Sequence, residues 1–122
     1  MISVTSEEII QAIMTSSIKK ASEPDRLFFL IIQHAYQAIS DLFFSVYSTL
    51  TKQSYHPICW RQETEAILKK KGKSDYSASK AYRMITLLNC LEKVSEKIMV
   101  TRLFYWTDTI NLLYYEQMSG RK

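Results

Sequence analysis

Glycine, proline and cysteine are scarce in this chain of 122 residues, which has only two of each. So few glycines and prolines argue against a disordered or low-complexity chain, because such chains are rich in these residues. Two cysteines, Cys59 and Cys90, are too few for the disulfide framework of a small secreted protein. They fit reduced thiols inside a cell. We therefore expect an ordered intracellular protein, either nuclear or cytoplasmic.

Long hydrophobic runs are also missing. The longest apolar run spans residues 27–32, whereas a membrane-spanning helix needs roughly 20 residues. The N-terminal region carries Glu7 and Glu8 and has no basic stretch of the kind that opens a signal peptide. We expect no membrane partner. The apolar fraction of 47% is ordinary for a globular domain.

Positive charge is concentrated in the middle of the chain. Residues 52–102 contain eleven Lys or Arg and five Asp or Glu, a net of +6, and the remainder has five against seven, a net of −2. A basic surface of this kind binds an RNA or DNA backbone weakly, because cations displace the counterions of the phosphates. The alternative is that lysines such as Lys69, Lys70 and Lys71 belong to a solvated loop.

Helical signals occupy the first part of the chain. Thr5 and Glu8 match a capping box, and apolar residues at helical spacing then predict a first helix from about Ser6 to Ile18. A polar break at residues 19–26 follows. A longer helix should begin near Leu27.

Apolar residues recur through this second helix at steps of three and four, which predicts its packing face. Because aromatic residues at such spacing usually lie in a core, we expect this face to be the main packing surface, with Leu42 and Val46 at its centre. The stripe consists of Phe28, Ile32, Ala35, Ile39, Leu42, Val46 and Leu50, widened by Tyr36, Phe43 and Tyr47.

The pattern changes after residue 63. Thr64 to Leu68 and Arg83 to Leu88 are short and rich in strand-favouring residues, and they flank a loop with Gly72. They predict two antiparallel strands. Asn89 with Glu92 then caps a third helix, and a last helical segment runs from Leu103 to about Leu113. The third helix should place Leu91, Val94, Ile98 and Met99 on an apolar face and Glu92, Lys93, Glu96 and Lys97 on a polar face.

The predicted fold is thus α+β and mostly helical, with N-terminal helices, a two-stranded hairpin, and then one or two helices. We divide the chain into a helical segment at residues 1–51, a hairpin-and-helix segment at 52–113, and a frayed tail at 114–122. Cys59, beside Trp60, is expected to be a small buried residue.

One stretch contains a recognisable motif, which consists of Tyr82, Arg83, Ile85, Leu87, Leu88, Asn89, Lys93, Glu96, Lys97, Arg102 and Leu103. This pattern resembles a block that reads approximately Tyr-Arg-Pro-Ile-Ser-Leu-Leu-Asn, followed by Lys-x-x-Glu-Lys and Arg-Leu. It is the first conserved block of the reverse transcriptases of non-LTR (LINE-like) retrotransposons.

The resemblance extends in both directions. Residues 55–61 are similar to the family's His-Pro-x-x-Trp segment, and residues 70–73 stand where the family has a Lys-Pro-Gly-Lys turn. Residues 20–26 and 117–121 are similar to its Lys-Ala-Pro-Gly-Pro-Asp-Gly and Gln-x-Gly-Phe-Arg blocks. The chain departs from this pattern at two glycine positions, now Glu23 and Arg26, and at two proline positions, now Lys71 and Met84, which suggests sequence drift.

The resemblance implies that the chain is the fingers part of an RNA-directed DNA polymerase, without its palm. Lys70 and Arg83 would then bind the triphosphate of a nucleotide, and Lys69, Lys71, Lys73 and Arg121 would contact nucleic acid. The full-length enzymes use Mg²⁺ held by palm aspartates. The aspartates of this chain, at positions 25, 41, 75 and 108, show no such pairing, so we expect neither catalytic residues nor a cofactor here.

Three hypotheses remain open at this point. The first is a truncated, catalytically incompetent fingers fragment whose partner is the missing palm, against which Phe104, Trp106, Leu112 and Leu113 would pack. The second is a small basic module that binds nucleic acid without sequence preference. The third is an inactive structural remnant, in which Arg83 forms a salt bridge within the hairpin. A zinc site is not expected, because His56 and Cys59 are joined only by the distant His34 and Cys90 as further ligands.

Overall fold

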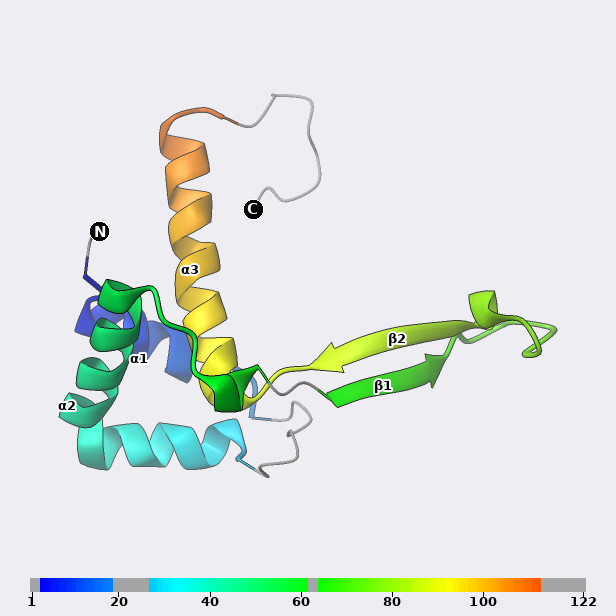
Figure 1. Ribbon diagram of the computed structural model, residues 1–122, viewed down its shortest axis with the longest axis horizontal. Coiled ribbons are helices and arrows are strands. Elements are labelled where there is room, and N and C mark those ends of the chain that lie inside the picture. Colours follow the sequence, from blue (N-terminus) through cyan, green and yellow to red (C-terminus); the bar gives the residue numbers. More distant parts are fainter. Residues whose placement is uncertain (1–2, 19–26, 62–63, 113–122) are drawn as a thin grey trace.

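The computed structural model describes residues 3–18, 27–61 and 64–112. It contains helices α1 (Ser6–Met14), α2 (Phe29–Gln53) and α3 (Cys90–Thr109) and strands β1 (Thr64–Lys69) and β2 (Tyr82–Leu87). The fold is α+β and mostly helical, as the sequence predicts. The three helices form a body, and the two strands form an arm, residues 64–87, that projects away from it (Figure 1). The predicted polar break at 19–26 and the predicted tail at 114–122 lie outside the described residues.

The N-terminus of α1 is the predicted capping box. The backbone N–H of Glu8 donates to the Thr5 hydroxyl at 3.2 Å, and the N–H of Thr5 donates to the Glu8 carboxylate at 2.8 Å. The helix ends at Met14 and not at Ile18, because the hydroxyls of Thr15 and Ser16 donate to carbonyls one turn back and such residues compete with helical hydrogen bonding. From α2, the Gln33 amide donates to the carbonyl of Ile13 at 3.2 Å.

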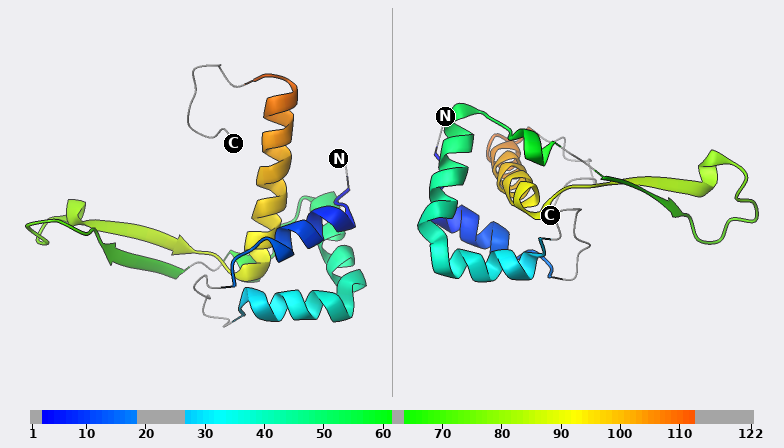
Figure 2. Two further views of the ribbon diagram at one scale, coloured as in Figure 1. Left: turned by 180° about the vertical axis from the view of Figure 1, so that it is seen from behind. Right: turned by 60° about the horizontal axis from the view of Figure 1, so that its bottom comes forward.

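The longer helix expected from near Leu27 is α2, and it is sharply bent (Figure 2). Ile39 has φ −135° and ψ 45°, values outside the helical region. The break comes just before Ser40 and Asp41, two residues of low helix propensity. The bend lets the two halves of α2 pack against different parts of the body.

The buried face of α2 is rotated relative to the predicted stripe. Leu42 is 57% exposed, and Ile39 and Val46 are also exposed, so the expected centre of the stripe was wrong. Ile32 and the widening aromatics Tyr36 and Tyr47 are buried, and Phe43 and Leu50 pack partly buried against them.

The aromatic face of α2 is buried in place of the aliphatic stripe for two physical reasons. Aromatic rings bury more area than the aliphatic residues beside them, and here they form a continuous series of contacts. The ring centroids of Tyr36 and Phe43 are 5.6 Å apart, those of Phe43 and Tyr47 6.4 Å, and those of Tyr47 and Trp60 6.0 Å. The buried Tyr47 hydroxyl also donates to the carbonyl of Leu91 in α3 at 2.8 Å. Burial raises the pKa of Tyr47, so the phenol keeps this proton.

Of the one or two helices expected after the hairpin, the described residues contain one, the continuous helix α3. Asn89 caps it by accepting the N–H of Glu92 at 2.8 Å, as predicted. Val94 and Ile98 enter the core together with Ile9 and Ile13 of α1. The predicted faces were wrong at two positions, since Met99 is exposed and Glu92 is buried. Cys59 is also exposed, against expectation, because the turn at Ile58–Trp60 directs Trp60 inward instead.

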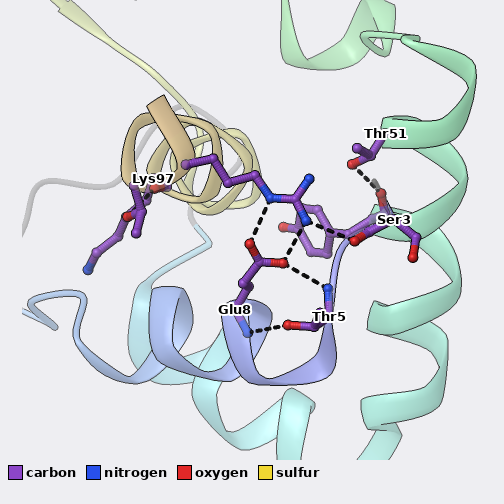
Figure 3. A network of polar contacts seen from close by, with 8 residues as sticks. Ser3, Thr5, Glu8, Thr51 and Lys97 are labelled. Carbon is purple, nitrogen blue, oxygen red and sulfur yellow. Dashed lines mark hydrogen bonds and ion pairs between the residues drawn. The ribbon is translucent and has the colours of Figure 1, made fainter. Parts of the chain in front are cut away.

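An ion pair joins α1 to α3. Arg102 donates from Nε and Nη2 to the two carboxylate oxygens of Glu8, each at 2.7 Å, and from Nη2 to the carbonyl of Ser3 at 2.8 Å. Nearby, the Lys97 ammonium donates to the hydroxyl of Thr15 at 2.6 Å. Figure 3 shows how Glu8 binds Thr5 and the guanidinium at the same time. These contacts fix the side of α3 that faces α1.

Candidate nucleic-acid interface

The arm is a two-stranded antiparallel hairpin, and none of the described helices covers either of its faces. Its register pairs Leu68 with Arg83 and Lys69 with Tyr82. Directly opposite residues share a face of a hairpin, so Arg83 lies on one face and Lys69 on the other. The ladder continues beyond β1, where the N–H of Lys70 donates to the carbonyl of Ala81 at 2.8 Å.

The two residues with a phosphate-binding role by resemblance lie near each other. Lys70 follows β1 on the face of Leu68, and it is therefore a diagonal neighbour of Arg83, typically about 7 to 8 Å away. The Lys70 ammonium donates to the carbonyl of Lys80 at 2.9 Å. This bond holds the Lys70 side chain against the tip of the arm, which is the loop at residues 70–81. Arg83 is exposed. Within the described part of the chain its side chain forms no hydrogen bond or ion pair, so the expected alternative of a salt bridge within the hairpin is not formed there.

Two tyrosines organise the tip of the arm. The Tyr82 hydroxyl donates to the carbonyl of Tyr76, and the Tyr76 hydroxyl donates to the carbonyl of Lys70, at 2.8 and 2.9 Å. The two rings meet edge to face with centroids 6.2 Å apart. The Lys69 ammonium lies 5.4 Å from the centre of the Tyr76 ring, within cation–π range. The tip is thus a folded loop, and these contacts fix where its backbone places the lysines.

The turn of the tip also has local support. Asp75 accepts hydrogen bonds from the backbone N–H and the hydroxyl of Ser77 at 2.8 and 2.7 Å, and these bonds hold the pKa of its carboxyl below the usual range. Gly72 adopts φ +77°, a conformation that L-residues avoid. Glycine is retained at this position although the family's neighbouring proline is Lys71.

The remaining candidate cations differ in their placement. Lys71 and Lys73 are exposed on the loop of the tip. Arg121 lies outside the described residues. The sequence reading did not single out Lys80, which is exposed in the short turn Ser79–Ala81. The positive charge of this stretch of sequence could have indicated Lys80, because six basic residues and one acidic residue, Asp75, lie between positions 69 and 83.

The arm can therefore present both charge and apolar surface to a ligand. Cations occupy its tip. Its shaft consists of strands β1 and β2, on which the opposite residues Ile67 and Met84 are each about two-thirds exposed. A two-stranded hairpin without a covered face is marginal in water. Phosphates would suit the tip, and flat or apolar groups would suit the shaft.

A histidine–carboxylate contact lies at the base of the arm, with the His56 side chain 44% and the Glu92 side chain 11% exposed. His56, from the loop before β1, contacts Glu92, in the first turn of α3 after β2, with 3.1 Å between Nε2 and Oε1. The His56 ring meets Trp60 edge to face with centroids 6.1 Å apart. This contact links the two chain segments that enter and leave the arm. Sequence reasoning missed it, because no spacing rule connects residues so far apart.

The carboxylates of the described residues are dispersed. Asp41, Asp75 and Asp108 belong to α2, the tip of the arm and α3 respectively. In residues 3–18, 27–61 and 64–112, no group of three or more His, Cys, Asp or Glu side chains is placed to hold a metal ion. Among these same residues, no helix has the length and apolar character that crossing a membrane requires.

Comparison with known proteins identifies one informative relative. No protein-family model matches the chain. Over 97 residues the chain is 31% identical to the retrovirus-related Pol polyprotein from type-1 retrotransposable element R1 of Bradysia coprophila. The chain is similar to part of a retrotransposon polyprotein. The aligned residues are 80% of this chain and 10% of the relative, so the chain spans about a tenth of that polyprotein. This similarity supports an origin in a non-LTR retrotransposon.

Proposed function

We propose that this chain is the fingers part of a retrotransposon reverse transcriptase and that its arm binds phosphate groups. Lys70 and Arg83 would neutralise the triphosphate of an incoming nucleotide, and Lys69, Lys71, Lys73 and Lys80 would contact the backbone of the nucleic acid. A planar guanidinium suits this role, since it can bind two phosphate oxygens at once. The similarity to a Pol polyprotein and the motif around Arg83 support the proposal.

One observation carries the proposal furthest. Arg83 is exposed on an arm that projects from the body (Figure 1), and it has no partner within the described residues. Arginine side chains on folded proteins commonly pair with a nearby carboxylate, but the acidic residue of the tip, Asp75, is bonded to Ser77. The guanidinium is therefore available to an anionic ligand.

The second candidate function is a small basic module that binds RNA or DNA without sequence preference. The tyrosine pair near the tip favours it, because aromatic rings can stack on bases and the Lys69 ammonium lies 5.4 Å from the centre of the Tyr76 ring. The two candidates differ in what Arg83 and Lys70 recognise. A fingers role requires that they bind a nucleoside triphosphate, whereas a general module requires only a polymer backbone.

The test is a titration of labelled single-stranded RNA by fluorescence anisotropy at several salt concentrations. We expect weak binding, with a Kd of about 10⁻⁴ to 10⁻⁶ M, that weakens steeply with salt. In K70A/R83A the slope of log K against log salt should flatten by about 0.7 for each phosphate contact that is lost. The matched control is K52A/K93A, which also removes two positive charges, but from the helices of the body.

Competition then separates the two candidates. If the arm takes a nucleotide, a deoxynucleoside triphosphate with Mg²⁺ should displace RNA from the wild-type chain more effectively than a nucleoside does, and K70A/R83A should abolish this difference. RNA binding that keeps its salt slope in K70A/R83A would contradict both candidates. RNA binding without triphosphate competition would leave only the second.

A further inference from the structure

Four lysines lie within five consecutive residues at the outer end of the arm. They are Lys69, Lys70, Lys71 and Lys73, and we call residues 69–73 the lysine segment. The nearest carboxylate in the sequence is that of Asp75, which accepts hydrogen bonds from Ser77 at 2.8 and 2.7 Å. Short lysine-rich segments have two common roles, which are contact with nucleic acid and nuclear import.

The lysine segment is accessible from outside the molecule. It lies at the end of the arm that is far from the helical body (Figures 1 and 2). Lys71 and Lys73 are exposed, and within the described part of the chain their side chains form no hydrogen bond or ion pair. Lys69 lies near an aromatic ring, and the Lys70 ammonium donates to a backbone carbonyl. Neither partner is a carboxylate, so these contacts do not neutralise the positive charge of the segment.

The lysine segment can become fully extended while the hairpin stays paired. Strand β1 ends at Lys69, so the backbone of this residue is already extended. The ladder then continues with the bond from the N–H of Lys70 to the carbonyl of Ala81 at 2.8 Å. The turn at Gly72, with φ +77°, lies beyond that bond. Loops open locally at a lower free-energy cost than core elements, so a partner can draw out this turn without separating β1 from β2.

We propose that the lysine segment is a nuclear import signal that binds the acidic groove of an import receptor. Each lysine ammonium carries three hydrogen-bond donors, and a run of them is complementary in charge to a groove lined by carboxylates. The inference concerns a protein partner of the arm. It does not require that the arm bind a nucleic acid or a nucleotide.

The alternation of the lysines favours a protein groove as the ligand of this segment. Lys69 and Lys70 lie on opposite faces of the hairpin, because neighbouring residues of a strand alternate. A nucleic-acid backbone that lies along one face contacts only one of them, whereas a groove that encloses an extended segment contacts both. Arg83 is paired with Leu68 in the register and therefore lies outside the lysine segment. The proposed import signal and the proposed phosphate-binding arginine can thus be removed separately.

Binding of the fluorescently labelled full chain to purified importin α without its autoinhibitory segment tests the proposal by anisotropy. The wild-type chain should bind, and K71A/K73A should bind at least about tenfold more weakly, because a charge-assisted hydrogen bond commonly contributes a factor of ten or more. Both side chains are exposed, so their truncation should leave the fold intact, which far-UV circular dichroism checks. The matched control K52A/K93A should bind like the wild type. R83A should also keep its affinity for the receptor.

Import in cells is the second measurement. The full chain is fused to a fluorescent cargo that is too large to diffuse through nuclear pores. Wild-type and R83A fusions should accumulate in the nucleus, and the K71A/K73A fusion should stay outside it. Receptor binding that K71A/K73A leaves unchanged overturns the proposal, and so does a wild-type chain that binds RNA but not the receptor. Accumulation that is lost in R83A and kept in K71A/K73A also overturns it, because the nuclear signal would then reflect retention by nucleic acid.

Discussion

Glu8 has two roles at the residue scale, since one carboxylate completes the capping box of α1 and binds Arg102 of α3. Its hydrogen bonds from the Arg102 side chain lower its pKa, and the same contact raises the pKa of Arg102. Both side chains are partly buried, with 29% and 20% of their surfaces exposed. The bidentate geometry makes this pair stronger than an ordinary surface ion pair.

Glu8→Gln should lower the free energy of unfolding at pH 7 by about 1 to 2 kcal/mol, because it removes a charge-assisted bidentate contact. A carboxyl with a lowered folded-state pKa stabilises the fold above its unfolded pKa of about 4.3. This contribution is lost as the pH falls through the folded-state pKa. Urea unfolding of wild type and variant should thus give curves that differ at pH 7 and converge once the pH has fallen below the lowered pKa of Glu8.

Glu7→Gln is the matched control for this prediction. Glu7 is exposed in the same helical turn, and its replacement should leave the unfolding curve almost unchanged at either pH. A stability difference between Glu8→Gln and wild type that persists undiminished in acid would mean that the carboxylate charge is not what joins α1 to α3.

At the scale of elements, α2 shows how two apolar stripes can overlap on one helix. Both stripes have helical spacing, with steps of three, four or seven residues, and they share Ile32 and Leu50. The structure buries the one that contains Tyr36, Phe43 and Tyr47. The hydrophobic pattern alone could not choose between them, because the choice depends on Trp60 and on the Leu91 carbonyl, which lie on other elements.

Two alanine variants on α2 should therefore differ in stability. Ile32→Ala should lower the free energy of unfolding by roughly 2 to 4 kcal/mol, since it leaves a cavity in the core. Leu42→Ala should cost less than about 1 kcal/mol, because that side chain is mainly in solvent. Thermal melts followed by circular dichroism measure both. Equal losses for the two variants would show that the aliphatic stripe also faces a core.

The arm is the element that the sequence predicted best. Its strands begin and end within one residue of the expected positions, because strand-favouring residues on both sides of a glycine turn define a hairpin locally. The positions of its cations could be predicted from the sequence only in part. The shared face of Lys70 and Arg83 follows from the strand register, which the sequence alone does not fix. The folded tip depends on tyrosine hydroxyls that bind particular carbonyls.

At the scale of the whole molecule, the body and the arm have different character. The body has a core of aliphatic and aromatic side chains from all three helices. The arm has a basic tip and an apolar shaft, with little of it buried. Among the described residues, the segments at the two ends of the arm are held by the capping residue Asn89 and by the His56–Glu92 contact.

Residues 1–122 should not extend a primer on any template with Mg²⁺ or Mn²⁺. Two-metal phosphoryl transfer requires neighbouring carboxylates, and the aspartates of the described residues lie on separate elements. The measurement is incorporation of labelled deoxynucleotide, with an active polymerase as the positive control. Incorporation that co-purifies with the chain through gel filtration and disappears in K70A/R83A would overturn this expectation.

The sequence by itself determined the element types, the N-caps of α1 and α3 and the hairpin, because each depends on residues a few positions apart. Thr5 and Glu8, Asn89 and Glu92, and the strands around Gly72 all act through local hydrogen bonding and backbone preference. Only the tertiary structure decided which face of α2 is buried, that Glu92 turns inward to His56, and that Cys59 turns outward. Those outcomes depend on contacts between residues far apart in the chain, whose burial and hydrogen bonding are fixed only when the helices pack together.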